Sequence, residues 1–278
     1  MQGVRCTGGN VIIFGQSGVG KSSIVNMLLG ENRIKVNADA KGCTFTSDPY
    51  VVDVGGGVLV RVHDTAGLGE GSAGTITSAD AIAALYKLLR NLNDGVNLLV
   101  FVMRVGRIVK TDEDNYKLFC KGFCASEVPI ALVLTHGDNC ITDEDDDDED
   151  SDPDDIAESA MKSWLDRNRA LFTANGLTFN NEAIVIAKKR GFPKTHESSR
   201  DKLRLLVSMG RRFTPWKMET NAWYIMAVKS IFNYVRRLLP FTTPAQLAPQ
   251  LTRVLTEYGG VSRENAITLA NQVESGLT

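Results

Sequence analysis

A glycine-rich loop between a strand pattern and a helical pattern constrains the fold of this chain more than any other feature. The apolar residues 11–14 predict a buried strand, and residues 23–29 have apolar side chains at helical spacing. In the loop pattern Gly-x-x-x-x-Gly-Lys-Ser, backbone N–H groups and the next helix N-terminus form a nest for phosphate oxygens. Strand, loop and helix together predict an α/β domain that binds a polyphosphate. The residues expected to contact it are Gly15, Gln16, Ser17, Gly18, Val19, Gly20, Lys21, Ser22 and Ser23.

The charged and hydroxyl groups around this loop indicate a nucleoside triphosphate bound with Mg²⁺. Lys21 would supply a positive charge to the β- and γ-phosphates, and the Ser22 hydroxyl would be a Mg²⁺ ligand. A second strand pattern, residues 58–63, continues into Asp64-Thr-Ala-Gly67. At the end of this strand in P-loop proteins, an Asp holds Mg²⁺ and the Gly N–H contacts the γ-phosphate. Although Asp-x-x-Gly alone is a common turn, its place here favours Asp64 and Gly67 as ligand residues.

The identity of the base depends on a third strand, residues 129–134, which continues into Thr135-His136-Gly-Asp138. GTPases have Asn/Thr-Lys-x-Asp at this place, where the carboxylate accepts hydrogen bonds from guanine N1–H and N2–H₂. Adenine lacks this donor pair, so Asp138 would select GTP over ATP; the alternative is a turn residue after a strand. His136 replaces the usual Lys, and its imidazole can still pack over the base. Ala187 is a weaker match to the loop that contacts guanine O6.

The order of these motifs resembles that of Ras-like GTPases. Residues 105–114 (Val-Gly-Arg-Ile-Val-Lys-Thr-Asp-Glu-Asp), called the box segment below, look like the extra box of the immunity-associated GTPases, the GIMAP-type or avirulence-induced proteins of the septin-like branch. The Thr135-His136 pair is also similar to the chloroplast outer-envelope import GTPases. The resemblance covers about residues 10–190. It implies a mostly parallel, doubly wound α/β sheet with one antiparallel hairpin strand, bound GTP or GDP with Mg²⁺, and a nucleotide-dependent homodimer.

Three residues are assigned to hydrolysis: Lys21, Thr44 and Arg107. Thr44 is the candidate first-switch ligand of Mg²⁺ and the γ-phosphate, with Thr46 as the alternative. The position after Gly67, where a Gln often orients the attacking water, is Leu68, so intrinsic hydrolysis is expected to be slow unless another group compensates. Gln16, inside the phosphate loop, is a candidate for that group. Arg107 could supply charge across a dimer, or it could be a solvated loop residue or pair with Asp112 or Glu113. The competing function is a GTP-gated scaffold with negligible hydrolysis.

The remaining patterns place further elements. A hairpin is expected from residues 50–54 and 58–63, and a last core strand at 183–188. Residues 1–210 are predicted to form the GTPase domain, and residues 211–278 a helical extension. The other expected elements are helices at 78–92, 111–123, 156–173, 197–209 and 220–239, and a strand at 97–103.

Charge is divided unevenly along the chain. Residues 143–155 contain 11 acidic side chains and predict a disordered surface insertion. Residues 156–278 contain 18 basic and 9 acidic side chains. The basic, amphipathic helix at 220–239 is expected either to pack as an outer layer or to contact an anionic membrane or a protein partner. No nucleic-acid partner is expected.

The five cysteines form no Cys-x-x-Cys pair, and Cys120 and Cys124 are expected to be core thiols. The sequence has no signal-peptide pattern and no apolar stretch of membrane-spanning length. We therefore expect a cytoplasmic protein, with peripheral membrane association as the alternative.

Overall fold

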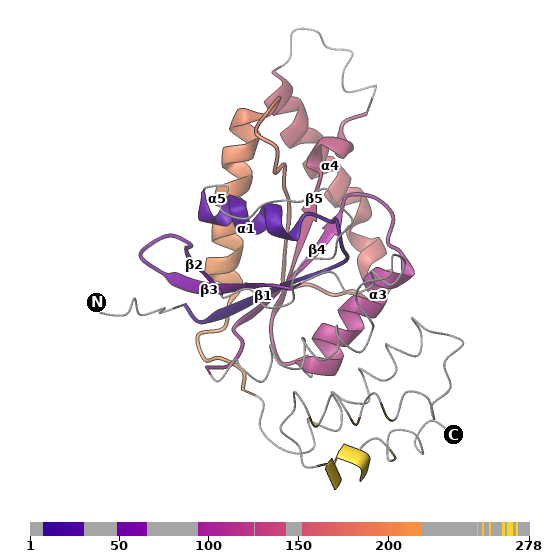
Figure 1. The fold of residues 1–278 in the computed structure, drawn as a ribbon. Helices are drawn as coiled ribbons and strands as arrows, with labels where there is room; N and C mark the ends of the chain where they lie inside the picture. Colours follow the sequence, from indigo (N-terminus) through magenta and orange to yellow (C-terminus); the bar gives the residue numbers. More distant parts are fainter. Residues whose placement is uncertain are drawn as a thin grey trace.

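The computed structural model describes residues 8–30, 49–65, 94–124, 126–142 and 152–217, together with isolated positions between 249 and 271. Six strands in these ranges form one sheet in the order β2-β3-β1-β4-β5-β6 (Figure 1). The strands are β1 (Asn10–Phe14), β2 (Tyr50–Asp53), β3 (Leu59–Asp64), β4 (Leu98–Arg104), β5 (Ile130–Thr135) and β6 (Asn181–Ile184). The helices are α1 (Lys21–Leu29), α3 (Lys110–Tyr116), the π-helix η1 (Lys117–Phe123), the 3₁₀-helix η2 (Gly137–Cys140), α4 (Pro153–Ala174) and α5 (Pro193–Gly210).

All neighbouring strands are parallel except β2 and β3, which form the predicted antiparallel hairpin. The parallel strands alternate with helices, as βαβ connections require. The predicted fold class, a mostly parallel doubly wound α/β sheet with one antiparallel strand, is confirmed. Because the parallel strands run in one direction, the loops that follow β1, β3, β4, β5 and β6 meet at one edge of the sheet, where such folds bind ligands.

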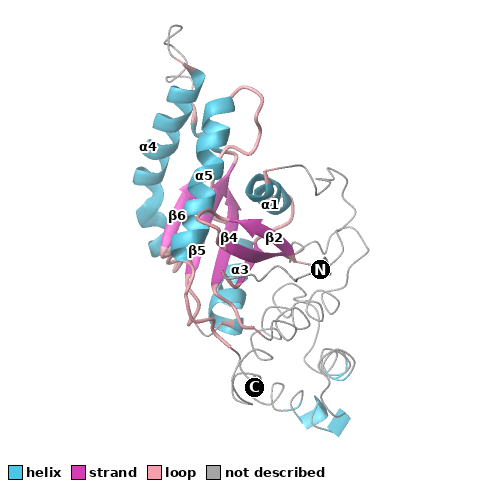
Figure 2. Cartoon of the chain, turned by 90° about the vertical axis from the view of Figure 1, so that its left-hand side faces the viewer, coloured by secondary structure: helices cyan, strands magenta, loops and turns pink. Residues whose placement is uncertain are grey.

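Helices cover both faces of the sheet (Figure 2). Ile12 and Phe14 of β1 belong to a core shared with α3, η1 and α4. Val11 and Ile13 point to the other face, into a core shared with α1 and α5. All four side chains are 0% exposed. A strand buried on both faces must be apolar at every position, so the continuous apolar run that precedes the loop is explained.

Two element boundaries differ from the sequence prediction near the ends of α4 and β6. The acidic insertion was expected to extend to residue 155, but α4 already begins at Pro153. Asp152 caps this helix, and the buried carboxylate of Asp154 accepts hydrogen bonds from the N–H and Oγ1 of Thr195, both at 2.6 Å. Carboxylates stabilise a helix N-terminus because they satisfy its N–H groups and its dipole. Strand β6 spans 181–184 instead of 183–188, since the Ile186 N–H donates to Ser199 Oγ instead of to the sheet.

The helix predicted at 111–123 is also different. It begins one residue earlier, and Val109 is its N-cap. From Lys117 it continues as a π-helix, in which the Cys124 N–H donates to the Phe119 carbonyl five residues back. Cys120 and Cys124 are 5% and 0% exposed, so both are core thiols as predicted. Helix α5 is longer than the predicted 197–209 and starts at a proline, which is favoured at a first helical position.

Several predictions fall on residues that the structure does not describe. They are Thr44, Thr46, Gly67, Leu68, the helices at 78–92 and 220–239, and most of the acidic run. Within the described ranges, no helix has both the length and the apolar character needed to span a membrane.

Candidate nucleotide-binding site

The glycine loop lies between β1 and α1 at the carboxyl edge of the sheet, where the sequence placed it. Gly15 has φ = +150°, and a Cβ there would lie 2.1 Å from the Val102 carbonyl oxygen of β4. Gly20, with φ = +98°, immediately precedes α1, and a Cβ there would come within 3.2 Å of Thr135. Only glycine combines these backbone angles with such close approach, so the loop can curl against β4 and β5.

Lys21, the first residue of α1, is 7% exposed and points back over the loop. Its ammonium group donates to the carbonyl oxygens of Gly15 at 3.1 Å and Gln16 at 2.7 Å. The positive charge is therefore held inside the concave side of the loop, together with the N–H groups of the helix N-terminus. This combination attracts the anionic oxygens of a polyphosphate.

Ser22 and Asp64 come together although 42 residues separate them. The Ser22 hydroxyl donates to Asp64 Oδ2 at 2.8 Å. The other oxygen, Oδ1, is buried and has no hydrogen-bond partner among the described residues. Burial raises the pKa of Asp64, and the Ser22 bond and the Lys21 charge oppose this shift. A hydroxyl beside a carboxylate oxygen that is buried and unpaired fits a hard divalent cation such as Mg²⁺.

Thr135 connects the predicted base motif to the phosphate loop. Its hydroxyl donates to the Val19 carbonyl oxygen at 2.6 Å, with the Met103 carbonyl oxygen at 3.2 Å. The residue is 1% exposed. Because its side chain contacts the loop backbone, Thr135 positions the loop relative to β5, and a direct contact with nucleotide remains a prediction.

His136 is the N-cap of η2, and Asp138 lies within η2. His136 adopts the left-handed conformation (φ = +57°), and its Nδ1 lies 3.0 Å from Thr135 Oγ1. Since the Thr135 proton is donated to Val19, Nδ1 of His136 is the protonated nitrogen of this contact. Burial and the charge of Arg104 lower the pKa of His136, so its imidazole is neutral near pH 7. Asp138 is half-buried in the first turn of η2.

The loop after β6 lies against this motif. The Gly137 N–H donates to the Val185 carbonyl oxygen at 3.1 Å, which brings the half-buried Ala187 close to η2. Asp138 and Ala187 therefore belong to neighbouring loops at the same sheet edge as Lys21, as their assignment to one nucleotide requires. Their contact with a guanine base remains a prediction.

A contact that the motif analysis missed joins the glycine loop to the box segment. Gln16 Nε2 donates to Asp112 Oδ1 at 2.7 Å, and Asp112 Oδ2 accepts from the Val109 N–H at 3.1 Å. Asp112 is 4% exposed, and burial raises the pKa of its carboxyl group. The sequence signal was an acidic residue at the third position of a helix, which indicates capping. Nothing in that pattern points to Gln16, 96 residues away.

A model of the AIG1 family matches residues 9–175, more than half of the chain. The chain belongs to the AIG1 family. It is 25% identical over 181 residues to Immune-associated nucleotide-binding protein 10 of Arabidopsis thaliana, with 65% of this chain and 37% of that protein covered. Immune-associated nucleotide-binding protein 3 of the same plant is 32% identical over 107 residues, 38% of this chain and 31% of the relative. The chain thus spans about a third of the length of these curated relatives.

Among solved structures, Toc33 from Arabidopsis thaliana in complex with GDP and Mg²⁺ has a TM-score of 0.45 and 21% identity, covering 73% of this chain and 86% of that one. The family resemblance drawn from the motifs and from residues 105–114 is confirmed by the match to the AIG1 family model.

Arg107 of the AIG1 box segment is exposed, in the connection between β4 and α3. The alternative in which it pairs with Asp112 or Glu113 is not what the structure shows. Asp112 binds Gln16, and Glu113 pairs with Lys110 and Lys117 at 2.9 and 3.2 Å. Within the described ranges, Arg107 makes no ion pair.

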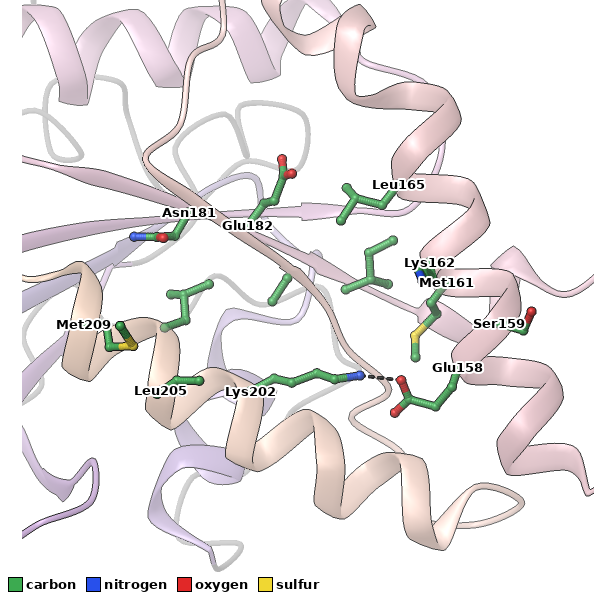
Figure 3. A pocket seen from close by; sticks show the side chains of 13 residues that line it. Glu158, Ser159, Met161, Lys162, Leu165, Asn181, Glu182, Lys202, Leu205 and Met209 are labelled. Atoms are coloured by element: carbon green, nitrogen blue, oxygen red, sulfur yellow. Dashed lines mark hydrogen bonds and ion pairs between the residues drawn. The ribbon is translucent and has the colours of Figure 1, made fainter.

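A cavity of about 630 Å³ lies elsewhere, between α4, β6 and α5 (Figure 3). An ion pair between Lys202 and Glu158 joins the two helices beside it. Leu165, Leu206 and Met209 are among its apolar lining residues. No residue of the glycine loop, of β3 or of the base motif lines this cavity, so it is separate from the nucleotide-binding site.

Proposed function

We propose that this AIG1 domain binds GTP and GDP with Mg²⁺, hydrolyses GTP slowly, and changes its interactions with the state of the nucleotide. The observation that carries the proposal is the placement of two groups of residues at the carboxyl ends of the parallel strands. Lys21, Ser22 and Asp64 lie after β1 and at the end of β3, and Asp138 follows β5. The first group fits a magnesium polyphosphate, and the second is the carboxylate that a guanine base would need.

The roles of the phosphate-binding residues follow from their contacts. Lys21 would exchange its bonds to the loop carbonyl oxygens for bonds to the β- and γ-phosphates. Ser22 and Asp64 would hold Mg²⁺, since the unpaired Asp64 oxygen gains a partner when a cation is present. The cation would neutralise charge on the phosphates. Gly67 and Thr44 are proposed to contact the γ-phosphate, and Thr44 also Mg²⁺.

Slow hydrolysis is inferred from Leu68, because an apolar side chain cannot orient an attacking water. A second copy of the chain could supply what is missing. Arg107 supports a nucleotide-dependent dimer, because it is exposed, makes no ion pair among the described residues, and belongs to the same box segment as Asp112, which contacts the glycine loop. The alternative function is a GTP-gated scaffold that assembles, in the cytoplasm or at a membrane, with negligible hydrolysis. It would bind GTP equally well.

Competition between nucleotides tests the proposal. Purified protein with Mg²⁺ is loaded with a fluorescent GDP analogue, which GTP, ATP or xanthosine triphosphate then displaces. GTP should compete far better than ATP. Asp138→Asn should weaken GTP binding by roughly ten- to a hundredfold, because a charge-assisted pair of hydrogen bonds is lost. The same variant should bind xanthosine triphosphate better relative to GTP than the wild-type protein does.

Lys21→Ala is the matched control at the phosphates. It should abolish binding of GTP, ATP and xanthosine triphosphate alike, because Lys21 contacts the phosphates that all three share. Equal competition by ATP and GTP against the wild-type protein would contradict guanine selectivity and leave only a general P-loop nucleotide site.

A further inference from the structure

The contact between Gln16 and Asp112 fixes the orientation of an amide in the glycine loop. An ionised carboxylate only accepts hydrogen bonds, so the Gln16 NH₂ group must face Asp112. The amide oxygen then faces away from Asp112, and among the described residues it has no hydrogen-bond partner. The Gln16 backbone is fixed as well, because its carbonyl oxygen accepts from Lys21 at 2.7 Å. The loop thus presents one side-chain acceptor in a defined orientation.

Asp112 is itself held firmly. Its second oxygen accepts from the Val109 N–H at 3.1 Å, and the residue is 4% exposed at the start of α3. Gln16 is half-buried, and its amide cannot rotate without breaking the bond to the buried Asp112. The contact links the nucleotide loop to the box segment, the part of the chain that also contains Arg107.

We propose that Asp112 is a positioning residue that holds Gln16 so that its amide oxygen accepts a hydrogen bond from the water attacking the γ-phosphate. This inference rests on the proposed hydrolysis of GTP. It assigns to the glycine loop the task that Leu68 cannot perform. The water oxygen forms a bond to the γ-phosphorus and its proton passes to a γ-phosphate oxygen, while the bond between the γ-phosphorus and the β–γ bridging oxygen breaks, which gives GDP and inorganic phosphate. Gln16 orients this water and is chemically unchanged.

Asp112→Asn distinguishes two roles of Asp112: orienting the Gln16 amide towards the water, and merely tethering the glycine loop to the box segment. An Asn whose oxygen accepts from the Val109 N–H turns its NH₂ group towards Gln16. The Gln16 amide must then rotate to accept that hydrogen bond, so the tether survives but the NH₂ group of Gln16 faces the water site. A structural tether alone predicts normal turnover in this variant. A positioning role predicts lost turnover with retained binding.

The test compares kcat for GTP with the affinity for a non-hydrolysable GTP analogue. The variants are Gln16→Ala, Asp112→Asn and the double variant. Glu113→Gln is the control, because Glu113 is next in sequence and, within the described part of the chain, forms ion pairs with Lys110 and Lys117 alone. We expect Gln16→Ala and Asp112→Asn each to lower kcat about ten- to a hundredfold while affinity changes less than about threefold. The double variant should be no slower than Gln16→Ala, because Asp112 acts through Gln16. Glu113→Gln should retain wild-type kcat.

Self-association of each variant is measured by sedimentation with the analogue bound. This measurement shows whether a substitution in the box segment lowers turnover by weakening the dimer. Wild-type turnover by Asp112→Asn would overturn the inference, as would equal losses in affinity and kcat, or additive losses in the double variant. The inference would also be overturned if the variants lost turnover in proportion to their loss of dimer formation. If wild-type protein binds GTP but does not hydrolyse it, the inference and the proposed hydrolysis fail together, and guanine binding stands.

Discussion

Replacing the Thr135 hydroxyl tests whether the base motif holds the glycine loop in place. Thr135→Val keeps the shape of the side chain but removes the donor to the Val19 carbonyl oxygen, a bond of 2.6 Å. It also removes the acceptor 3.0 Å from His136 Nδ1. Since the residue is 1% exposed, water cannot replace the lost hydroxyl without rearrangement.

The expected loss follows from these contacts. A buried hydrogen bond contributes about 1 kcal/mol, and a buried carbonyl left unpaired costs about 1–3 kcal/mol. Thr135→Val should therefore lower the free energy of unfolding by about 2 kcal/mol and Tm by roughly 4–8 °C. Thr135→Ser is the matched control, because it retains the hydroxyl and loses one methyl group, at a cost of about 1 kcal/mol. The predicted order of stability is wild type, then Ser, then Val.

Urea unfolding and thermal unfolding, each with and without GDP, provide the measurement. If packing of the methyl group dominated instead, Val would be at least as stable as Ser. That result would refute the role of the hydroxyl in joining β5 to the glycine loop. Weaker GDP binding by Val than by Ser would show in addition that the tether shapes the phosphate site.

The remaining predictions concern the box segment and a half-buried histidine. If Arg107 acts across a dimer, GTPase activity per molecule should rise with protein concentration, and Arg107→Ala should flatten that rise without weakening GTP binding; activity independent of concentration would remove Arg107 from the reaction. Burial, and then the charge of Arg61, lower the pKa of His63 from 6.5 to about 4. The unfolded chain therefore binds a proton that the folded protein does not between pH 6.5 and 4, so stability should fall by up to about 3 kcal/mol as pH decreases through this window. His63→Gln should remove this part of the slope in unfolding experiments at pH 7 to 5, and parallel profiles for the two proteins would contradict the assignment.

Most of the local structure could be predicted from the sequence. Apolar runs specified β1, β4 and β5 because these strands are buried on both faces, and Gly55-Gly56-Gly57 placed the β2–β3 hairpin. The glycine loop could be recognised because its backbone geometry needs glycine at fixed positions. The ends of helices and strands were predicted least well where tertiary contacts determine them. Strand β6 ends where Ser199 of α5 takes the Ile186 N–H, and α4 begins early because Thr195 binds Asp154.

By itself, the sequence determined the glycine loop and the set of polar residues at the ends of the strands, because each depends on neighbours within a few positions. The order of these motifs along the chain indicated the fold class. The tertiary structure alone decided how those residues are used. Thr135 reaches Val19 across 116 residues, Gln16 reaches Asp112 across 96, and Ser22 reaches Asp64 across 42. These contacts depend on the order of strands in the sheet and on the packing of α3 beside the glycine loop. Since local periodicity carries no information about which strand ends meet, only the assembled sheet shows that the base motif and the box segment both hold the phosphate loop.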